Sequence, residues 1–395
     1  MKYITKTILL LSLISLFTDI ASEMLYPVMP MYLKSIGFSV LLIGILEGIA
    51  EATAGFSKGY FGNLSDHLGM RRPFVQIGYT LSAISKPLMA LWTHPLGIFL
   101  ARTTDRLGKG VRTAARDTML SSETTPEFKG RVFGFHRGFD TLGAAIGPIL
   151  ALAFLTTYPE AYRELFLLAF IPGLLAVVTT FAVKEKRRDP ALDPPSTVSA
   201  PKFFTFLTYW KAAPRQYRLL IVGLLAFALV NSSDMLLLLM MKYNGATDQQ
   251  VILVYVFYNV VYALASFPMG IIGDKIGLRW AFMFGLLLFA VVYGGIIFTT
   301  SVPVLFALFF LYGVYAASTE GISKAWISNI VPEGETATAI GLYTGLNSVS
   351  ALLASSVAGW LWFSFGPAFT FGLSAIGALL VMLFFVFAFP KDMSE

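Results

Sequence analysis

The stretch GNLSDHLGMRR, from Gly62 to Arg72, recurs as GIIGDKIGLRW from Gly270 to Trp280. The two copies share two glycines, an aspartate and an arginine at matching positions: Gly62, Asp66, Gly69 and Arg71 in the first, and Gly270, Asp274, Gly277 and Arg279 in the second. Glycine permits a tight turn, and charged side chains favour the water boundary of a membrane. Each copy is therefore typical of a short loop between two membrane spans, and its recurrence predicts a duplicated chain.

The sequence around these loops is strongly apolar. Hydrophobic residues make up 56% of the 395 residues and charged residues 13%, and the mean hydropathy is +0.71, whereas an ordinary soluble domain has about 25% charged residues. A membrane-spanning helix needs about 20 mainly apolar residues. Twelve such runs follow one another, from one near 7–32 to one near 366–389. The sequence therefore predicts an all-α membrane protein with twelve transmembrane helices in two pseudo-symmetric six-helix bundles.

The basic residues predict how the chain is oriented. Lys and Arg gather in segments that face the cytoplasm if the amino terminus lies inside, including Lys2, Lys6 and residues 184–188. We expect a multi-pass protein of the cytoplasmic (inner) membrane with both termini in the cytoplasm. The net charge of +6 follows from this bias, so it does not predict a nucleic-acid partner.

Several kinds of chemistry have no support in the sequence. The chain has no Cys and three His residues, which argues against a soft-metal centre. It has no phosphate-binding GxxxxGK[ST] stretch and no nucleophile motif. We therefore expect no enzyme activity, no cofactor and no bound metal, and we expect a monomer whose partners are a small-molecule solute, protons and the lipid bilayer.

The chain divides around one polar segment. The stretch KEKRRDPALDPPSTVSAPKFF, which starts at Lys184, is rich in charge and proline and can neither span lipid nor pack as a core. We expect an amino-terminal six-helix bundle at 1–184, a cytoplasmic linker at 185–215 and a carboxy-terminal six-helix bundle at 216–395. The halves overlay at SEML (22–25) and SDML (233–236), and Gly134 and Gly138 overlay Gly341 and Gly345.

Charged residues lie inside several predicted spans. Asp19 and Glu23 are four residues apart on the first span and share a face, and Glu47 and Glu51 repeat that spacing on the second. A charge at the bilayer centre costs roughly 2.5 to 3.5 kcal/mol. An embedded carboxyl group can take up a proton on one side and release it on the other. We therefore expect these four residues to couple transport to protons.

The fourth predicted span, near 96–120, contains the stretch ARTTDRLGKGVRTAARD (101–117), a basic stripe in which Asp105 is embedded, and Asp140 lies on the fifth span. The stripe either pairs with the chain's own acids or binds an organic anion, because guanidinium groups recognise carboxylate and phosphate. A salt-bridge network that only holds the helices together is the structural alternative. The predicted substrate-binding residues are Arg102, Asp105, Arg106, Asp140, Asn231, Asp234, Tyr258, Glu320 and Lys324.

The repeated loop resembles the loop between helices 2 and 3, and its echo between helices 8 and 9, of the major facilitator superfamily of transporters. The resemblance covers essentially the whole chain. It implies that spans 1, 4, 7 and 10 line a central cavity and that the two halves rock to give alternating access. It also implies that Gly62, Asp66 and Arg71 or Arg72 lock the cytoplasmic side, together with Asp117, and that Asp274 and Arg279 form a lesser equivalent.

The fifth span contains Gly143, Gly147 and Pro148, a GxxxGP core that resembles the antiporter motif of proton-driven drug exporters. The two glycines that normally close that motif are replaced by Ala151 and Leu152. We count these residues among those that gate the conformational change. The resemblance favours proton-coupled export of an organic or amphipathic compound by antiport. The alternatives are proton-coupled symport of an organic anion bound by Arg102 and Arg106, export of a hard metal cation, and a sensor that transports nothing.

Overall fold

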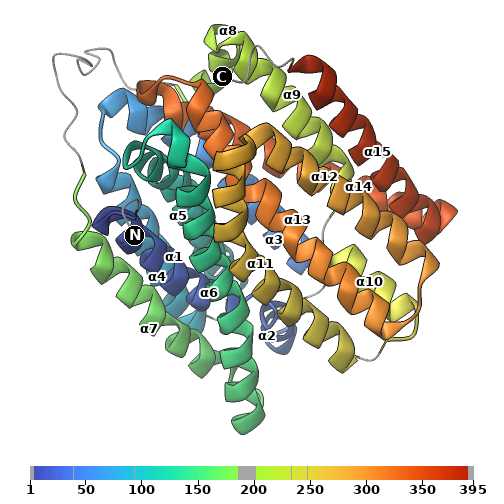
Figure 1. Cartoon of the computed structure of the whole chain (residues 1–395). Coiled ribbons are helices and arrows are strands. Elements are labelled where there is room, and N and C mark those ends of the chain that lie inside the picture. Colours follow the sequence, from blue (N-terminus) through green and yellow to red (C-terminus); the bar gives the residue numbers. More distant parts are fainter. Residues whose placement is uncertain are drawn as a thin grey trace. The chain divides into compact units, whose positions relative to one another are not determined.

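The computed structural model of the chain describes residues 4–38, 40–92, 94–185, 202–232, 234–246 and 248–389. These residues form helices and short connections, with no strand among them (Figure 1). The helices before residue 185 are α1 (Lys6–Glu23), α2 (Met29–Ser35), α3 (Val40–Leu68), α4 (Arg72–Leu91), α5 (Pro95–Ser122), α6 (Lys129–Thr157) and α7 (Tyr162–Phe181). The predicted linker falls largely on residues 186–201, which lie outside the described residues.

The second half repeats this order after a short helix α8 (Tyr209–Ala212). Its helices are α9 (Arg215–Val230), α10 (Asp234–Tyr243), α11 (Asp248–Ile276), α12 (Leu278–Gly295), α13 (Val302–Ile330), α14 (Thr336–Phe365) and α15 (Pro367–Ala388). Short 3-10 turns connect some of them: Pro126–Phe128, Thr205–Thr208, Ile296–Phe298 and Glu333–Glu335.

The first and seventh predicted spans differ from the prediction, because each is broken into two helices. The run near 7–32 forms α1 and α2, which are separated at Pro27. Proline lacks a backbone N–H and disfavours a helical residue before it, so the helix stops there. The seventh span forms α9 and α10 and breaks at Asn231 and Ser232, whose side chains compete for backbone hydrogen bonds. The SEML stretch contains the last residue of α1, Glu23, whereas the SDML stretch contains the first residue of α10, Asp234, so the two breaks lie on opposite sides of the overlaid residues.

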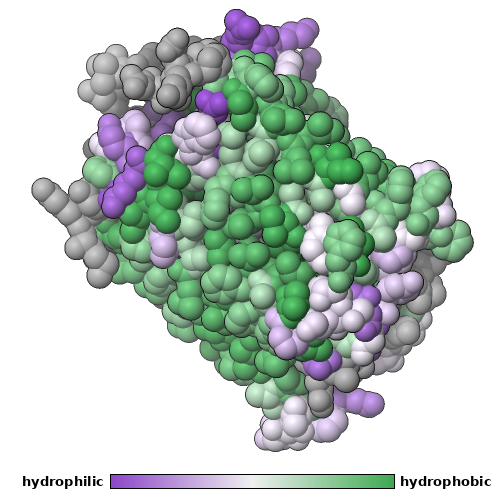
Figure 2. Space-filling view, turned by 45° about the vertical axis from the view of Figure 1, so that its right-hand side comes forward, coloured by the Kyte–Doolittle hydropathy of each residue, from purple (hydrophilic) through white to green (hydrophobic). Residues whose placement is uncertain are grey.

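Several helices are suited to cross a membrane. By length and composition seven of the described helical segments qualify, or up to eight if the bent pair Thr205–Ala212 and Arg215–Val230 is one span. The helices α3 and α5, which carry embedded charges, are not among the seven. On the face drawn in Figure 2, hydrophobic residues cover most of the surface, and hydrophilic residues gather towards its upper and lower margins. Large apolar side chains such as Phe298 and Phe363 are exposed (88% and 91%), which suits contact with lipid.

Packing divides the chain into two compact units. The first unit comprises Met1–Thr124, Phe139–Ala212 and Val331–Gly345, and the second comprises Thr125–Gly138, Ala213–Ile330 and Leu346–Glu395. The first turns of α14 therefore belong to the first unit, and the first turns of α6 belong to the second. Each unit takes the beginning of one helix from the other half of the sequence.

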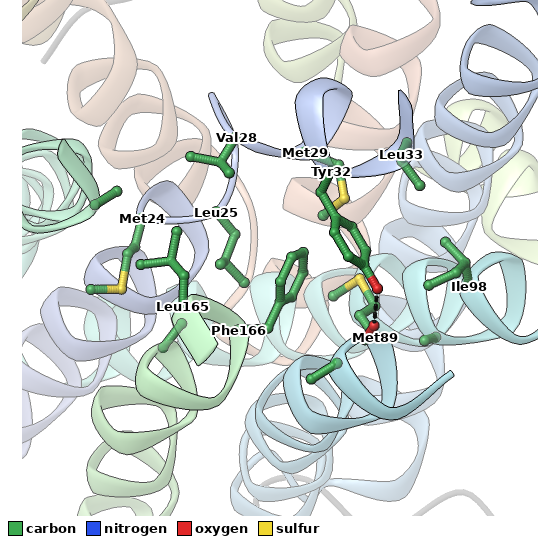
Figure 3. Packing of buried hydrophobic residues seen from close by; sticks show 14 of the residues in the cluster. Met24, Leu25, Val28, Met29, Tyr32, Leu33, Met89, Ile98, Leu165 and Phe166 are labelled. Atoms are coloured by element: carbon green, nitrogen blue, oxygen red, sulfur yellow. Dashed lines mark hydrogen bonds between the residues drawn. The ribbon is translucent and has the colours of Figure 1, made fainter. Parts of the chain in front are cut away.

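Within the first unit, α4 packs on α5 and α7, α3 packs on α5, and α1 packs on α7. A buried apolar cluster anchors α2 to α4, α5 and α7 (Figure 3). Tyr32 lies against Phe166 with ring centroids 4.7 Å apart, and its hydroxyl donates to the carbonyl of Met89 at 2.8 Å. These contacts hold the broken end of the first span in place.

Within the second unit, α13 packs on α11 and α12, and α15 packs on α12 and α9. Aromatic rings fill the contacts: Phe227 lies 5.1 Å from Phe289, and Phe282 lies 5.3 Å from Phe385, measured between ring centroids. Edge-to-face arrangements of this kind are favourable for aromatic pairs. Dispersion and ring contacts stabilise helix packing where lipid removes the usual hydrophobic driving force.

Candidate functional site

Gly62 of the first loop motif and Gly341 lie at a seam between α3 and α14, inside the first unit. A Cβ atom on Gly62 would collide with the carbonyl oxygen of Ala337. A Cβ on Gly341 would lie 2.5 Å from the carbonyl oxygen of Lys58. The two backbones therefore touch, and only glycine fits at these positions.

A matching seam joins α6 and α11 in the second unit. A Cβ on Gly270 would collide with the carbonyl oxygen of Gly130, and one on Gly138 would lie 3.0 Å from the carbonyl oxygen of Ala263. Glycines that overlay one another in the sequence, such as Gly138 and Gly345, therefore have the same structural role in the two units, which is to allow close contact between two helix backbones. Each lets the beginning of a helix approach the second helix of the repeat.

The aspartate of each motif accepts hydrogen bonds from the first turn of a helix at its seam. This helix is α14 for Asp66 and α6 for Asp274. Asp66 Oδ2 accepts from the backbone N of Thr338 at 2.7 Å and from its Oγ1 at 2.9 Å. Asp274 Oδ1 accepts from the backbone N of Gly130 at 2.7 Å, and its Oδ2 accepts from the backbone N of Arg131 at 3.0 Å. A carboxylate at a helix N-terminus satisfies unpaired N–H groups and is attracted by the helix dipole.

Basic side chains complete the two aspartate sites. Arg71 Nη2 lies 3.2 Å from Asp66 Oδ1, and Arg131 Nε lies 2.7 Å from Asp274 Oδ2. Arg72 instead donates from Nη2 to the carbonyl of Phe181 at 3.1 Å, and Arg279 donates to the carbonyl of Val386 at 3.0 Å. Of the two arginines expected near Asp66, Arg71 is the one that contacts its carboxylate, and Asp274 is contacted by Arg131 of α6.

The sequence reasoning missed Arg131 and Thr338, because no local pattern marks them as partners of the motif. Asp117, which was also predicted near this lock, is fully buried (0% exposed) and accepts from Arg116 Nη2 at 2.9 Å.

The fifth-span glycines bring α6 against α1. A Cβ on Gly143 would lie 2.6 Å from the carbonyl oxygen of Leu16, and one on Gly147 would lie 2.7 Å from the backbone N of Met24. Pro148 lies inside α6, directly after this contact. The GxxxGP core is therefore a close helix contact next to Asp19.

Two predicted carboxyl residues meet at this contact. Asp140 on α6 shares a side-chain hydrogen bond with Asp19 on α1. Ser15 Oγ donates to Asp140 Oδ1 at 2.5 Å, and Arg116 Nη1 lies 3.1 Å from Ser15 Oγ and 3.9 Å from Asp140 Oδ1. Two carboxylates in contact repel each other.

Glu23 lies one turn after Asp19, within electrostatic range of Lys109, Arg106 and Arg102. Glu47 and Glu51 belong to α3, but their side chains lie outside the part of the chain that the structure describes. Of the four predicted proton-coupling residues, Asp19 and Glu23 therefore lie beside the basic stripe of α5.

Arg102, Arg112 and Arg116 of the α5 stripe contact the chain's own groups. Lys86 Nζ on α4 lies 2.7 Å from Asp105 Oδ1, and Arg102 Nη1 lies 3.5 Å from Asp105 Oδ2. Lys86, Asp105 and Arg102 are buried, with 1%, 6% and 5% of their surface exposed. Arg112 Nη1 donates to Ser82 Oγ at 2.6 Å, and its guanidinium lies 4.5 Å from the ring centroid of Tyr79.

Lys86 was missed in the sequence, although a lone lysine in the apolar run at 73–93 was a signal for a buried partner. Its Nζ also lies 3.3 Å from Ser22 Oγ, so it connects the end of α1 to the α4–α5 pair.

In the second unit, Asp234 lies at the beginning of α10 and contacts Tyr258, another predicted residue. Its oxygens accept from Tyr312 Oη at 2.6 Å and from Tyr258 Oη at 3.2 Å. Glu320 lies 3.7 Å from Arg137 Nη2, and Arg137 donates to the hydroxyl of Tyr262. Asn231 lies at the break before α10, and Lys324 is partly buried on α13. Across the described residues, no group of three or more His, Asp or Glu side chains is placed to hold a metal ion.

Long apolar helices and paired internal charges define a multi-pass membrane protein. The chain belongs to the major facilitator superfamily, whose family model matches residues 11–243 and 219–395. This family consists of transporters with a twelve-helix fold, so the predicted fold class and family are confirmed.

Three similar proteins illustrate the membership. An uncharacterised MFS-type transporter of Methanocaldococcus jannaschii, MJ1317, is 33% identical over 392 residues, which cover 98% of this chain and 96% of the relative. The multidrug resistance protein MdtG of Klebsiella pneumoniae is 23% identical over 190 residues, covering 47% of this chain and 45% of the relative. The crystal structure of the human organic anion transporter MFSD10 matches with a TM-score of 0.80 and 17% identity, covering 96% of this chain and 98% of that one.

Proposed function

We propose that the chain is a proton-coupled antiporter that exports an organic or amphipathic compound from the cytoplasm across the inner membrane. The observation that carries this proposal is the internal pairing of the α5 stripe. Arg102 and Lys86 both contact Asp105, and Arg116 contacts Asp117. A stripe that neutralises the chain's own acids is a poor site for an anion, because a solute carboxylate would have to displace a buried ion pair.

The contact between Asp19 and Asp140 supports proton coupling. The two carboxyl groups lie close together, and in this proposal they share a proton, because two adjacent carboxylates repel each other. The pair's neighbours Ser15 and Arg116 offer a donor and a positive charge that stabilise the ionised pair when that proton leaves. Uptake and loss of one proton at this contact therefore change the interaction between α1 and α6.

The partial similarity to MdtG supports the direction, since that relative is named as a multidrug resistance protein. The two aspartate sites supply the gate in this proposal. Asp66 holds the first turn of α14 against α3, and Asp274 holds the first turn of α6 against α11. The beginnings of α14 and α6 both lie on the expected cytoplasmic side. In this proposal, opening that side requires Asp66 to release α14 and Asp274 to release α6.

Proton flux in liposomes tests the proposal. The purified chain is reconstituted with the pH dye pyranine inside, a pH gradient is imposed, and organic cations, neutral amphiphiles and organic anions are added in turn. We expect cations or neutral amphiphiles to cause proton flux in the exchange direction, and Asp19→Asn to abolish it. Glu164→Gln makes the same chemical change at an exposed carboxyl on α7 and should leave the flux unchanged.

Two results would contradict the proposal. Flux that is unchanged in Asp19→Asn would remove the carboxyl pair from coupling. Flux that only organic anions drive, in the symport direction, would favour the alternative in which the α5 arginines bind the solute.

A further inference from the structure

Asp234 occupies an unusual position for a carboxylate inside a membrane protein. It is the first residue of α10, directly after the break in the seventh span. Tyr312 of α13 donates to its Oδ1 and Tyr258 of α11 donates to its Oδ2. The carboxylate is therefore held among three helices by neutral hydroxyl groups.

No lysine, arginine or histidine among the described residues forms an ion pair with Asp234. The aspartates Asp66, Asp105, Asp117 and Asp274 each have such a partner. Glu320, which is also acidic, lies within electrostatic range of Asp234. The nearby Arg137 is engaged by Glu320 and Tyr262. An embedded charge without a counter-charge is expensive, and such residues mark functional sites in membrane proteins.

Aromatic rings surround the Asp234 carboxylate. The ring centroids of Tyr258 and Tyr312 are 5.2 Å apart, Tyr262 stacks on Tyr258 at 6.2 Å, and Tyr315 lies 5.1 Å from Tyr312. The face of a tyrosine ring carries negative charge density and attracts cations within about 6 Å of its centroid. Rings and carboxylate together form an environment that favours positive charge.

An unsatisfied acceptor lies three residues before Asp234. Asn231 Oδ1 is buried and has no hydrogen-bond partner in the described part of the chain. A buried acceptor left unpaired costs free energy, which a donor or a cation would recover. Asn231 and Asp234 thus both present acceptor oxygens at the same break.

We propose that Asp234 is the counter-charge for a positively charged nitrogen of the transported compound, a protonated tertiary amine or a quaternary ammonium. The cation lies against the carboxylate and the rings of Tyr258 and Tyr312. Asn231 Oδ1 accepts a hydrogen bond from the solute when the nitrogen carries a proton. This inference rests on the proposed export of organic compounds and names the class of compound as organic cations.

Equilibrium binding to the purified full chain tests the inference without any gradient. The probe is tetraphenylphosphonium, a permanent organic cation, and Nile red serves as a neutral amphiphile. Asp234→Asn keeps the shape of the side chain but removes the charge, and it retains one acceptor oxygen for the two tyrosine hydroxyls. We expect it to weaken tetraphenylphosphonium binding by at least about tenfold and to leave Nile red binding within about twofold. Asp234→Glu should retain most of the affinity, and Glu164→Gln should retain all of it.

A pair of variants tests the ring contribution and does not depend on Asp234→Asn folding. Tyr258→Phe keeps the ring and removes the hydroxyl, whereas Tyr258→Leu removes both. Binding of the cation should persist in the first and fall several-fold in the second, with unchanged thermal unfolding of the ligand-free protein as the check on folding. Equal losses in both variants, with the unfolding temperature retained, would overturn the ring contact.

Three outcomes would overturn the inference. The unaltered chain could fail to bind tetraphenylphosphonium. Asp234→Asn could bind it normally while losing solute-driven proton flux, which would make Asp234 a proton site. Asp234→Asn could lose both probes, which would make it a structural residue. Failure of proton coupling alone, with charge-dependent binding retained, would instead refute the proposed antiport and leave the cation site standing.

Discussion

Asp66→Asn should release the first turn of α14 from α3. The carboxylate accepts two hydrogen bonds from Thr338 and one from Arg71. Hydrogen bonds to a charged acceptor stabilise by about 1 kcal/mol more than bonds to a neutral one. The charge at a helix N-terminus adds about 0.3–1 kcal/mol. An amide at this position keeps part of the contact, so we expect a loss of about 2 kcal/mol, which shifts the equilibrium between the closed and open seam by roughly thirtyfold.

The chain suits a cysteine accessibility assay because it contains no cysteine. Ser65 lies one turn after Gly62 on the same face of α3 and is fully buried (0% exposed). In a Ser65→Cys background, Asp66→Asn should raise the rate of maleimide labelling several-fold to thirtyfold. Ser57→Cys is the matched control, since Ser57 is also buried on α3 but contacts Gly110 of α5.

An unchanged labelling rate at Ser65→Cys would refute the assignment of Asp66 as the residue that holds this seam. An equal rise at Ser57→Cys would show that the substitution loosens the whole unit, which would also contradict a local lock.

Two further predictions follow from the buried contacts. Lys86→Met should lower the free energy of unfolding in mixed micelles by about 1–3 kcal/mol, because it removes the nearer of the two basic partners of Asp105, at 2.7 Å, and leaves Arg102. The double variant with Asp105→Leu should recover part of the loss, and a double variant as unstable as the single one would contradict the pairing argument. Gly270→Ala should destabilise by about 1–3 kcal/mol, because its Cβ meets the Gly130 carbonyl. Gly294→Ala is the control, because nothing lies within 4 Å of the added Cβ on α12, and it should be neutral or stabilising by up to about 1 kcal/mol. Equal shifts in the unfolding temperature of Gly270→Ala and Gly294→Ala would argue against a backbone contact at Gly270.

Much of the fold could be predicted from local patterns. The repeated loop, the apolar runs and the low charge content predicted a duplicated all-helical membrane protein of this family, and both the fold class and the family are confirmed. The breaks at Pro27 and Asn231 were visible as residues that disfavour helix, but the long apolar runs around them outweighed that signal in the prediction of continuous spans.

The functional roles of the predicted residues stay predictions, but their neighbours are now placed. The spacing of Asp19 and Glu23 predicted a shared face, because helix periodicity is a local property. Their contacts with Asp140, Lys109 and the α5 arginines involve residues on other helices. Helix periodicity predicts the face of the helix on which a side chain lies, but it does not predict which neighbouring helix that face contacts.

The sequence by itself determined the class of protein, the two loop motifs and the set of embedded charges, because each depends on composition or on spacing within about ten residues. The tertiary structure alone decided the partners: Lys86 for Asp105, Arg131 for Asp274, Thr338 for Asp66, and two tyrosines in place of a cation for Asp234. Each of these contacts joins different helices, and it forms only where small residues let their backbones approach in one register. Crossing position and register are properties of packed helices, so no single stretch of sequence contains them.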